Sequence, residues 1–582
     1  MTDSSNDFRT AGPRRPNSPR RREGAEARAR RPLRDVVCEI DRDILRLLLR
    51  RTNLLTKMRG SKPRLEAAEE KALREAWEAA VARVSRDARL SGHFFSLMQE
   101  VEFLPRPAAH DEADVPEGAA AREPQHTAFN LAPAPKPVRL RLAAPLACRA
   151  TRAWLMLAAA SGQALRLEPC LMNDPIVDCV KMLNQAGAAL SREDDGVTAR
   201  QAAPLGAPDK VLHAGDSAWN FFLLLGHYLG RPSRAKFTGE AGLKLANFSA
   251  VRHFLPTLGA RLVPVVPKSE GLPARLECSG ILPDSVSLPA DVPAELAESL
   301  LLAAPGYEQG LNLDLAAHAE REHILARTMP ILRAAGADAH VEGTAVRVHP
   351  GPLQLPERPE VDMEPELALF LLALPLALGG EVRLTGRWST LPAARAGWDA
   401  LQRCGLDLHM QGAGVLARGK APLKTLPRWE PPADFPAAWS PLPLALTACS
   451  ALRCGEAALP VLPAGTDMVT AESFLHAAGL EHDGTGILRK ISQDSPHPAW
   501  NAPNPVWALA LALTACASPH RKLGNPGVMT ELYPAFWALY NSLPEPGARS
   551  ARKAEEPATA TRRRIITDVV AVAPPENRDD ED

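Results

Sequence analysis

Several features are scarce or missing in this 582-residue chain, and each absence excludes a class of protein. The nine cysteines include no CxxC pair, which argues against a disulfide framework or a cysteine zinc site and favours reduced thiols. Basic and acidic residues balance at 68 each, so no net charge favours nucleic acid binding. The 15 histidines form no HxxxH or HxH pair, so we expect neither a metal site nor another cofactor.

Long apolar runs are missing as well. The most apolar run, Leu367–Leu378, is shorter than the ~20 residues of a membrane-spanning helix and contains Pro375. Residues 1–32 contain nine arginines and no apolar signal core, so we expect a disordered tail, with an RNA-binding arm or an organelle transit peptide as alternatives. Residues 549–582 are expected to be a second disordered, charged tail. The chain is therefore expected to be cytoplasmic, with no membrane or nucleic acid partner.

Between the tails, six alanine- and leucine-rich runs alternate with short segments, most of which end in glycine. Intervals of 72, 77, 69 and 74 residues separate these glycines, too long for solenoid repeats of about 20–50 residues, so each repeat should be a small packed unit. β-like runs such as Arg261–Val266 and Glu381–Leu384 indicate α/β units, and helices this apolar should be buried. The six runs are Ala153–Ala160, Phe221–Leu229, Leu296–Ala304, Leu367–Leu378, Leu442–Leu452 and Val506–Cys516; the glycines are Gly187, Gly259, Gly336, Gly405 and Gly479.

A separate helical piece precedes the repeats. Apolar residues from Leu33 to Met58 recur at helical spacing, and two further helices are predicted across Leu65–Val84 and Gly92–Leu104. Three helices in residues 33–104 make a thin core, so we expect a homodimer through them. The proline-rich residues 105–136 are predicted to be a linker, and residues 137–548 one two-lobed body.

Arg34, Arg51 and Lys62 follow an Arg–x16–Arg–x10–Lys spacing that places Arg51 and Lys62 on one helical face. Solvated side chains on an amphipathic helix are the alternative interpretation. The run PLRDVVCEIDRDILRLLLRRTNLLTKMRGSK resembles the all-helical chorismate mutase family, which rearranges chorismate to prephenate without acid, base or covalent steps. The resemblance implies that the partner protomer's Arg34 and this protomer's Arg51 bind carboxylates, Lys62 donates to the ether oxygen and Glu70 accepts from the substrate hydroxyl. The sequence departs from the family at Glu69, where an anion replaces a cation.

Residues 137–548 resemble the enolpyruvyl transferases, specifically the 5-enolpyruvylshikimate-3-phosphate synthase family. The resemblance implies an α + α/β chain, in which a three-helix domain precedes six βαβαββ-type repeats in two lobes, residues 147–360 and residues 137–146 plus 361–548. Most of the family's cations and catalytic groups are replaced, although Arg152 is retained. The replacements include Ala147-Cys148 for Lys-Ser, Ala218-Trp219 for Gly-Thr, Pro441 for the catalytic aspartate and Glu531 for the last lysine.

Four retained groups are candidates for a reduced anion site at helix N-termini, with a purely structural role as the alternative: Arg152, Asp216, Ser217 and Lys244. Each lost charge-assisted contact removes ~1.5–3 kcal/mol, so binding of the family's two polyanions should be abolished.

Together, the two resemblances predict a shikimate-pathway protein of aromatic amino acid biosynthesis. In the main hypothesis the helical domain rearranges chorismate, or binds a related anion, while the body lacks its usual activity. An altered 3-phosphoshikimate 1-carboxyvinyltransferase is one alternative. The other is a non-catalytic scaffold or regulator that binds an aromatic product or other shikimate-pathway enzymes.

Overall fold

The computed structural model describes Arg51, residues 71–73 and 75–77, and residues 128–543 apart from 209, 268, 483, 485 and 492–498. The chain divides into two units, Met1–Pro105 and Arg106–Asp582. In the first unit, the described residues at 51 and between 71 and 77 are helical. The three predicted helices of residues 33–104, and both predicted tails, otherwise lie outside the described residues.

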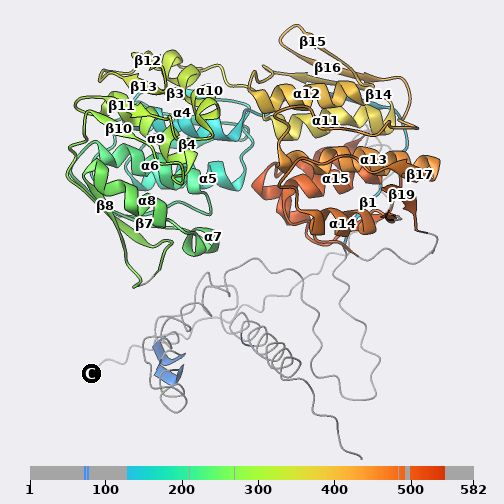
Figure 1. The fold of residues 1–582 in the computed structure, drawn as a ribbon, viewed down its shortest axis with the longest axis horizontal. Coiled ribbons are helices and arrows are strands. Elements are labelled where there is room, and N and C mark those ends of the chain that lie inside the picture. The colour runs from blue at the N-terminus through green and yellow to red at the C-terminus, as the bar shows by residue number, and fades with distance from the viewer. Residues whose placement is uncertain are drawn as a thin grey trace, which may run out of the picture. The chain divides into compact units, whose positions relative to one another are not determined.

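In the second unit, the elements from α4 to β13 form a first lobe built on three sheets (Figure 1). Two four-stranded sheets share one strand order, in which a parallel pair continues into an antiparallel hairpin. A three-stranded antiparallel sheet repeats the pattern without its outer parallel strand. In sheet order, the strands are β6 (Val211–His213), β7 (Ser233–Thr238), β9 (Ala274–Cys278) and β8 (Ala260–Pro264); β10 (Ser285–Ser287), β11 (Leu311–Asp314), β13 (Ala345–Val348) and β12 (Ala339–Glu342); and β3 (Leu165–Leu167), β5 (Val197–Ala199) and β4 (Leu190–Arg192).

The second lobe, from α11 to α16, uses the same pattern, with one strand supplied from before the first lobe (Figure 1). Its strand β2 (Val138–Ala143) pairs in parallel with β14 (Gly380–Thr385), so the chain passes through the second lobe before forming the first. The remaining strands, in sheet order, are β16 (Gly414–Gly419) and β15 (Asp407–Gln411); then β17 (Glu456–Ala458), β19 (Ile487–Lys490) and β18 (Leu480–His482).

A two-stranded sheet lies partly within the stretch that the sequence predicts to be linker. Residues Phe129–Leu131 form β1, which pairs antiparallel with β20 (Arg521–Leu523). Leu131 is fully buried, because it packs into the core of the body. The ordered body therefore begins before residue 137, the boundary predicted from the sequence.

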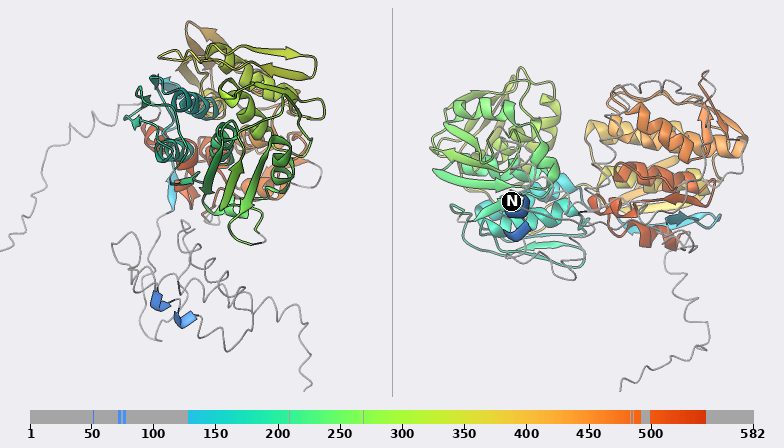
Figure 2. Two further views of the ribbon diagram at one scale, coloured as in Figure 1. Left: turned by 90° about the vertical axis from the view of Figure 1, so that its left-hand side faces the viewer. Right: turned by 90° about the horizontal axis from the view of Figure 1, so that it is seen from below.

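Each lobe is centred on three mutually packed apolar helices. These six helices contain the six apolar runs except for the last residues of two of them, Ala304 and Cys516. Nearly every residue of the runs is buried, as expected for helices that are apolar around their circumference. The sheets lie around them (Figure 2). They are α4 (Cys148–Ser161), α6 (Ala218–Leu229) and α9 (Ala294–Ala303) in the first lobe, and α11 (Pro365–Leu378), α13 (Pro441–Cys454) and α15 (Pro505–Ala515) in the second.

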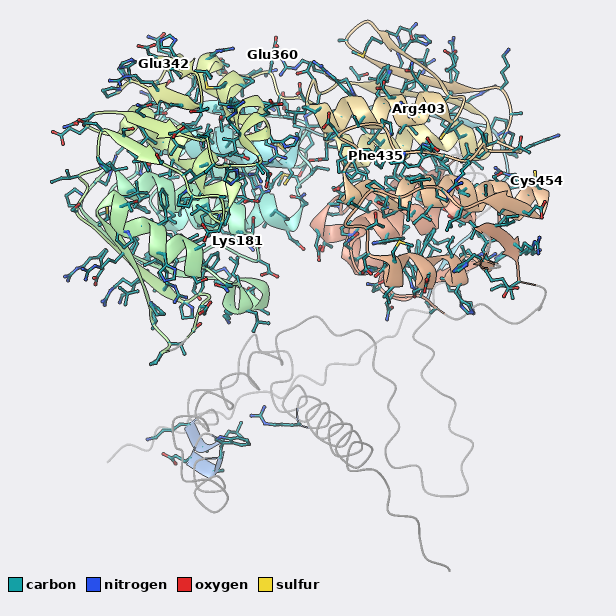
Figure 3. The ribbon with its side chains drawn as sticks, viewed as in Figure 1. Lys181, Glu342, Glu360, Arg403, Phe435 and Cys454 are labelled. Carbon is teal, nitrogen blue, oxygen red and sulfur yellow. The ribbon has the colours of Figure 1, made fainter. Side chains whose placement is uncertain are left out.

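The remaining helices pack at the periphery. On α5 and α12, one face is apolar and the other carries exposed residues such as Lys181 and Arg403 (Figure 3). All five glycines that mark the repeats have positive φ, which explains the residue type at these turns. No helix of the described residues is long and apolar enough to cross a bilayer. The peripheral helices are α5 (Asp174–Gln185), α7 (Ala241–Leu245), α8 (Ser249–Phe254), α10 (Arg321–Ala334), α12 (Pro392–Arg403), α14 (Met468–Ala477) and α16 (Phe536–Ser542), with short 3-10 turns at Leu255–Leu258, Ala304–Gly306, Ala437–Trp439 and Pro526–Glu531.

Candidate functional site

Arg152 links the N-terminal ends of two central helices. Its Nη1 donates to Ser217 Oγ at 2.7 Å and to Asn220 Oδ1 at 3.1 Å, and its Nε donates to the Cys148 carbonyl at 3.2 Å. Ser217 is the N-cap of α6 and also accepts from the backbone N–H of Asn220. Arg152 is 8% exposed, so its bonds within the protein hold α4 against α6. This arrangement supports the structural role weighed for Arg152 and Ser217.

The other two candidate residues of the body are associated with α7: Asp216, which precedes α6, bonds to it, and Lys244 belongs to it. Asp216 accepts a 3.0 Å hydrogen bond from the backbone N–H of Leu243, so its carboxylate supports the start of that helix. Lys244 lies in the last turn of α7 and is half-buried. The structure thus joins Arg152 to Ser217, whereas the Asp216 carboxylate bonds to a different element.

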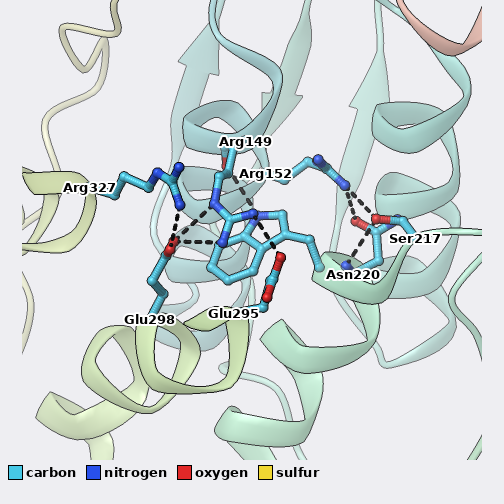
Figure 4. A network of polar contacts seen from close by, with 8 residues as sticks. Arg149, Arg152, Ser217, Asn220, Glu295, Glu298 and Arg327 are labelled. Atoms are coloured by element: carbon cyan, nitrogen blue, oxygen red, sulfur yellow. Dashed lines mark hydrogen bonds and ion pairs between the residues drawn. The ribbon is translucent and has the colours of Figure 1, made fainter. Parts of the chain in front are cut away.

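A buried carboxylate that the sequence did not single out lies beside this network, on α9 (Figure 4). Glu298 accepts from Arg149 Nε at 2.9 Å and pairs with Arg327 Nη1 at 3.1 Å, while its own side chain is 2% exposed. The Arg149 guanidinium also lies 4.1 Å from the centre of the Trp219 ring, a cation–π geometry. Two arginines therefore share one internal anion.

Burial raises the pKa of the Glu298 carboxyl, and the two arginines oppose that shift. The direction shows that attraction to Arg149 and Arg327 does not fully offset the loss of hydration. A sequence signal for this group existed, since a glutamate inside the apolar run Leu296–Ala304 is rarely buried without a partner. The sequence did not indicate which residues pair with Glu298, because Arg149 and Arg327 lie on other helices.

These side chains line a cavity of about 620 Å³ bounded by residues of both lobes. The first lobe contributes α4, α9 and α10, and the segments around Asp362 and Ser389 contribute from the second. Its apolar residues include Ala150, Ala153, Leu302, Pro330, Ile331, Met363 and Leu391. The volume of this cavity, and its mixture of apolar residues with a few charged ones, are typical of a small-molecule site.

A second internal carboxylate lies at the N-terminus of α4. Glu364, which precedes α11, accepts a 2.8 Å hydrogen bond from the backbone N–H of Cys148. Helix N-termini attract anions, and here the second lobe supplies one. The neighbouring Glu366 accepts from Trp439 Nε1 at 3.1 Å, and its burial together with the nearby Glu364 raises its pKa to about 7.

A third group of carboxylates surrounds the position where the family resemblance places a lysine. Burial raises the pKa of Glu531, and nearby Asp174 and Asp216 raise it further. Thr530 donates to Asp174 at 2.7 Å, so this contact joins the second lobe to α5 of the first. A phosphate or a carboxylate would be repelled at this end of the interface.

The sites predicted in the helical piece are mostly outside the described residues. Arg51 is helical and half-buried. Arg34, Lys62 and Glu70 lie outside the described residues, so their arrangement stays a prediction.

The repeated sheets and paired lobes define an enolpyruvyl transferase fold. EPSP synthase from Acinetobacter baumannii has a similar structure, with a TM-score of 0.56 and 18% identity over 71% of this chain and 97% of that chain. The enolpyruvyl transferase NikO from Streptomyces tendae gives a TM-score of 0.50 and 14% identity over 69% of this chain and 94% of that one. At these identities the likeness concerns the fold alone.

The sequence comparison is more specific. Residues 134–424, half of the chain, match the family model described as EPSP synthase (3-phosphoshikimate 1-carboxyvinyltransferase), and the chain belongs to this family. Two 3-phosphoshikimate 1-carboxyvinyltransferases are relatives. The one from Parvibaculum lavamentivorans is 29% identical over 44% of this chain and 57% of its own length. The one from Roseobacter denitrificans is 24% identical over 49% of this chain and 61% of its own length. The chain thus spans little more than half the length of these curated relatives. Family membership connects the protein to the shikimate pathway.

Proposed function

We propose that this protein acts in the shikimate pathway through an altered transferase body, which binds a carboxylate ligand in the cavity between its lobes without transferring a carboxyvinyl group. Family membership and the retained fold support the pathway. The observation that carries the altered chemistry is Glu298, which neutralises the arginines facing it. Phosphoenolpyruvate and shikimate 3-phosphate both need uncompensated positive charge.

The test is phosphate release by the full chain given phosphoenolpyruvate and shikimate 3-phosphate, with the Acinetobacter baumannii EPSP synthase as a positive control. We expect no release above the enzyme-free rate. Steady release that scales with protein concentration would overturn the proposal. It would instead favour the second candidate, carboxyvinyl transfer at an altered site, which is the activity in the relatives' names.

A thermal-shift series identifies pathway ligands of the body, because a ligand that binds the folded state raises its melting temperature. Shikimate, chorismate, phenylalanine and tyrosine are compared with phosphoenolpyruvate and shikimate 3-phosphate. We expect a shift from at least one ligand of the first group and none from the two phosphorylated ones. A shift from the phosphorylated pair alone contradicts the proposal.

For the helical piece we propose chorismate rearrangement to prephenate, supported by the spacing of Arg34, Arg51 and Lys62. The measurement is loss of chorismate absorbance with the full chain. Arg51→Ala should abolish turnover, whereas the matched neighbour Arg50→Ala, about 100° around the helix, should retain it. Equal turnover in both variants, or none in the wild type, rejects this activity.

A further inference from the structure

The charge balance of the cavity described above points to a particular class of ligand. Four arginines and three carboxylates line it. Arg387 pairs with Glu360 and Asp362, and Arg358 pairs with Glu168 just outside the lining. Glu298 serves both remaining arginines, and the partly exposed Glu295 also lies 3.8 Å from Arg149. Among the described residues, Arg327 therefore has only the shared Glu298 as a carboxylate partner. It can receive one negative charge from a ligand, whereas a second negative charge would meet the internal carboxylates.

Arg327 is the residue best placed to receive that charge. Its Nη1 pairs with Glu298, and among the described residues no contact engages its Nε or Nη2. Those two nitrogens form the edge through which a guanidinium binds a carboxylate by two parallel hydrogen bonds. The Arg327 side chain is 35% exposed, so a ligand can reach this edge.

The wall next to Arg327 is apolar. Ile331 follows it by one turn of α10, so both lie on the helix face that lines the cavity, together with Pro330 and Ala334. Ala150 and Ala153 of α4 add small apolar side chains, and Leu302 of α9 continues the apolar surface. A ligand could thus place its carboxylate on Arg327 and its apolar body on the adjacent apolar wall of the cavity.

We propose that the cavity binds a monocarboxylate with an uncharged, apolar body, with the carboxylate on the Nε–Nη2 edge of Arg327 and the apolar body against Ile331. This inference rests on the proposed function and narrows it to one ligand class. Arg327 is the charge-binding residue, and Glu298 sets the selectivity by excluding a second negative charge.

Three probes of one ring test the charge requirement on the full chain by ligand-observed NMR titration: benzoate with one charge, phthalate with two and benzamide with none. Benzoate should bind at least about tenfold more tightly than benzamide, the equivalent of one charge-assisted contact. Phthalate should bind more weakly than benzoate. Phthalate binding as tightly as benzoate, or benzamide binding equally well, overturns the inference.

Matched variants on α10 test the location. Arg327→Gln should weaken benzoate binding at least about tenfold, whereas the same change at the exposed Arg333, outside the cavity, should leave it unchanged. Ile331→Glu should also abolish binding, by adding a charge to the apolar wall. A melting temperature for each variant confirms folding, and unchanged benzoate binding by folded Arg327→Gln refutes the site.

The two assays distinguish failure of the proposed function from failure of the ligand class. Phosphate release in the transferase assay removes the proposed function. Absence of benzoate binding without phosphate release removes the ligand class alone.

Discussion

Replacing Glu298 by glutamine tests most directly whether the protein supplies its own anion. The substitution keeps the side-chain size but removes the charge shared by Arg149 and Arg327. Loss of one partner from a fully buried ion pair costs about 3–5 kcal/mol. Here both arginines keep roughly a third of their exposure, and the raised pKa of Glu298 shows that its own burial already carries a cost. We therefore expect Glu298→Gln to lower the free energy of unfolding by only about 1–2 kcal/mol.

The same substitution should create affinity for anions with two charges. A freed arginine donates charge-assisted hydrogen bonds worth about 1.5–3 kcal/mol, which corresponds to roughly ten- to hundredfold tighter binding. Calorimetric titration of inorganic phosphate and phthalate into wild type and variant measures this gain. Phosphate should also raise the variant's melting temperature, because it binds the folded state.

Glu295→Gln is the matched control. Glu295 lies on the same helix, 3.8 Å from Arg149, but its side chain is 36% exposed, so water already screens its charge. We expect less than about a threefold change in phosphate affinity from this control. If Glu298→Gln binds phosphate no better than wild type or Glu295→Gln, the internal-anion reasoning is refuted.

Three further predictions concern stability. Because burial raises the folded pKa of Glu366 from 4.5 to about 7, its contribution to stability is full below pH 4.5 and is lost as the pH rises through 7; Glu366→Gln should therefore raise the melting temperature at pH 8 but not at pH 4. Arg152→Met removes the bonds to Ser217 and to the α4 carbonyl and should cost about 2–4 kcal/mol in urea unfolding, whereas a change within 0.5 kcal/mol would contradict its linking role. Glu531→Lys replaces a carboxylate repelled by Asp174 with an attracted ammonium and should stabilise the protein by about 1 kcal/mol; a lower melting temperature would contradict this.

The fold was predictable because its main signals are local. A helix that is apolar on every side has to be buried, and the run Leu367–Leu378 lies within α11, where all of these residues are buried. Turns with positive φ select glycine, so residues such as Gly259 and Gly336 mark the repeats. The strand Phe129–Leu131 was assigned to the linker instead, because its partner, β20, lies nearly four hundred residues further along the chain.

The site was less predictable, because its geometry depends on contacts between distant helices. Trp219, which stands where the family resemblance expects a threonine, lies buried against Arg149. It missed the pairing of Glu298 with Arg327, two residues that have no common periodicity and come from α9 and α10. Glu364 was missed for the same reason, since its acceptor role depends on a backbone N–H from the other lobe.

The internal carboxylates of the body have one physical effect in common. A transferase cleft must keep positive charge unpaired until its anionic substrates arrive, and that unpaired charge destabilises the empty protein. Here Glu298 pairs with the arginines and Glu364 accepts a hydrogen bond from the first residue of α4, so internal anions already compensate these positive groups. Such a cleft is stable without a ligand, and it should prefer ligands that carry little charge and much apolar surface. The body's stability should consequently be independent of added phosphate, while its affinity for an apolar monocarboxylate should depend on the Nε–Nη2 edge of Arg327.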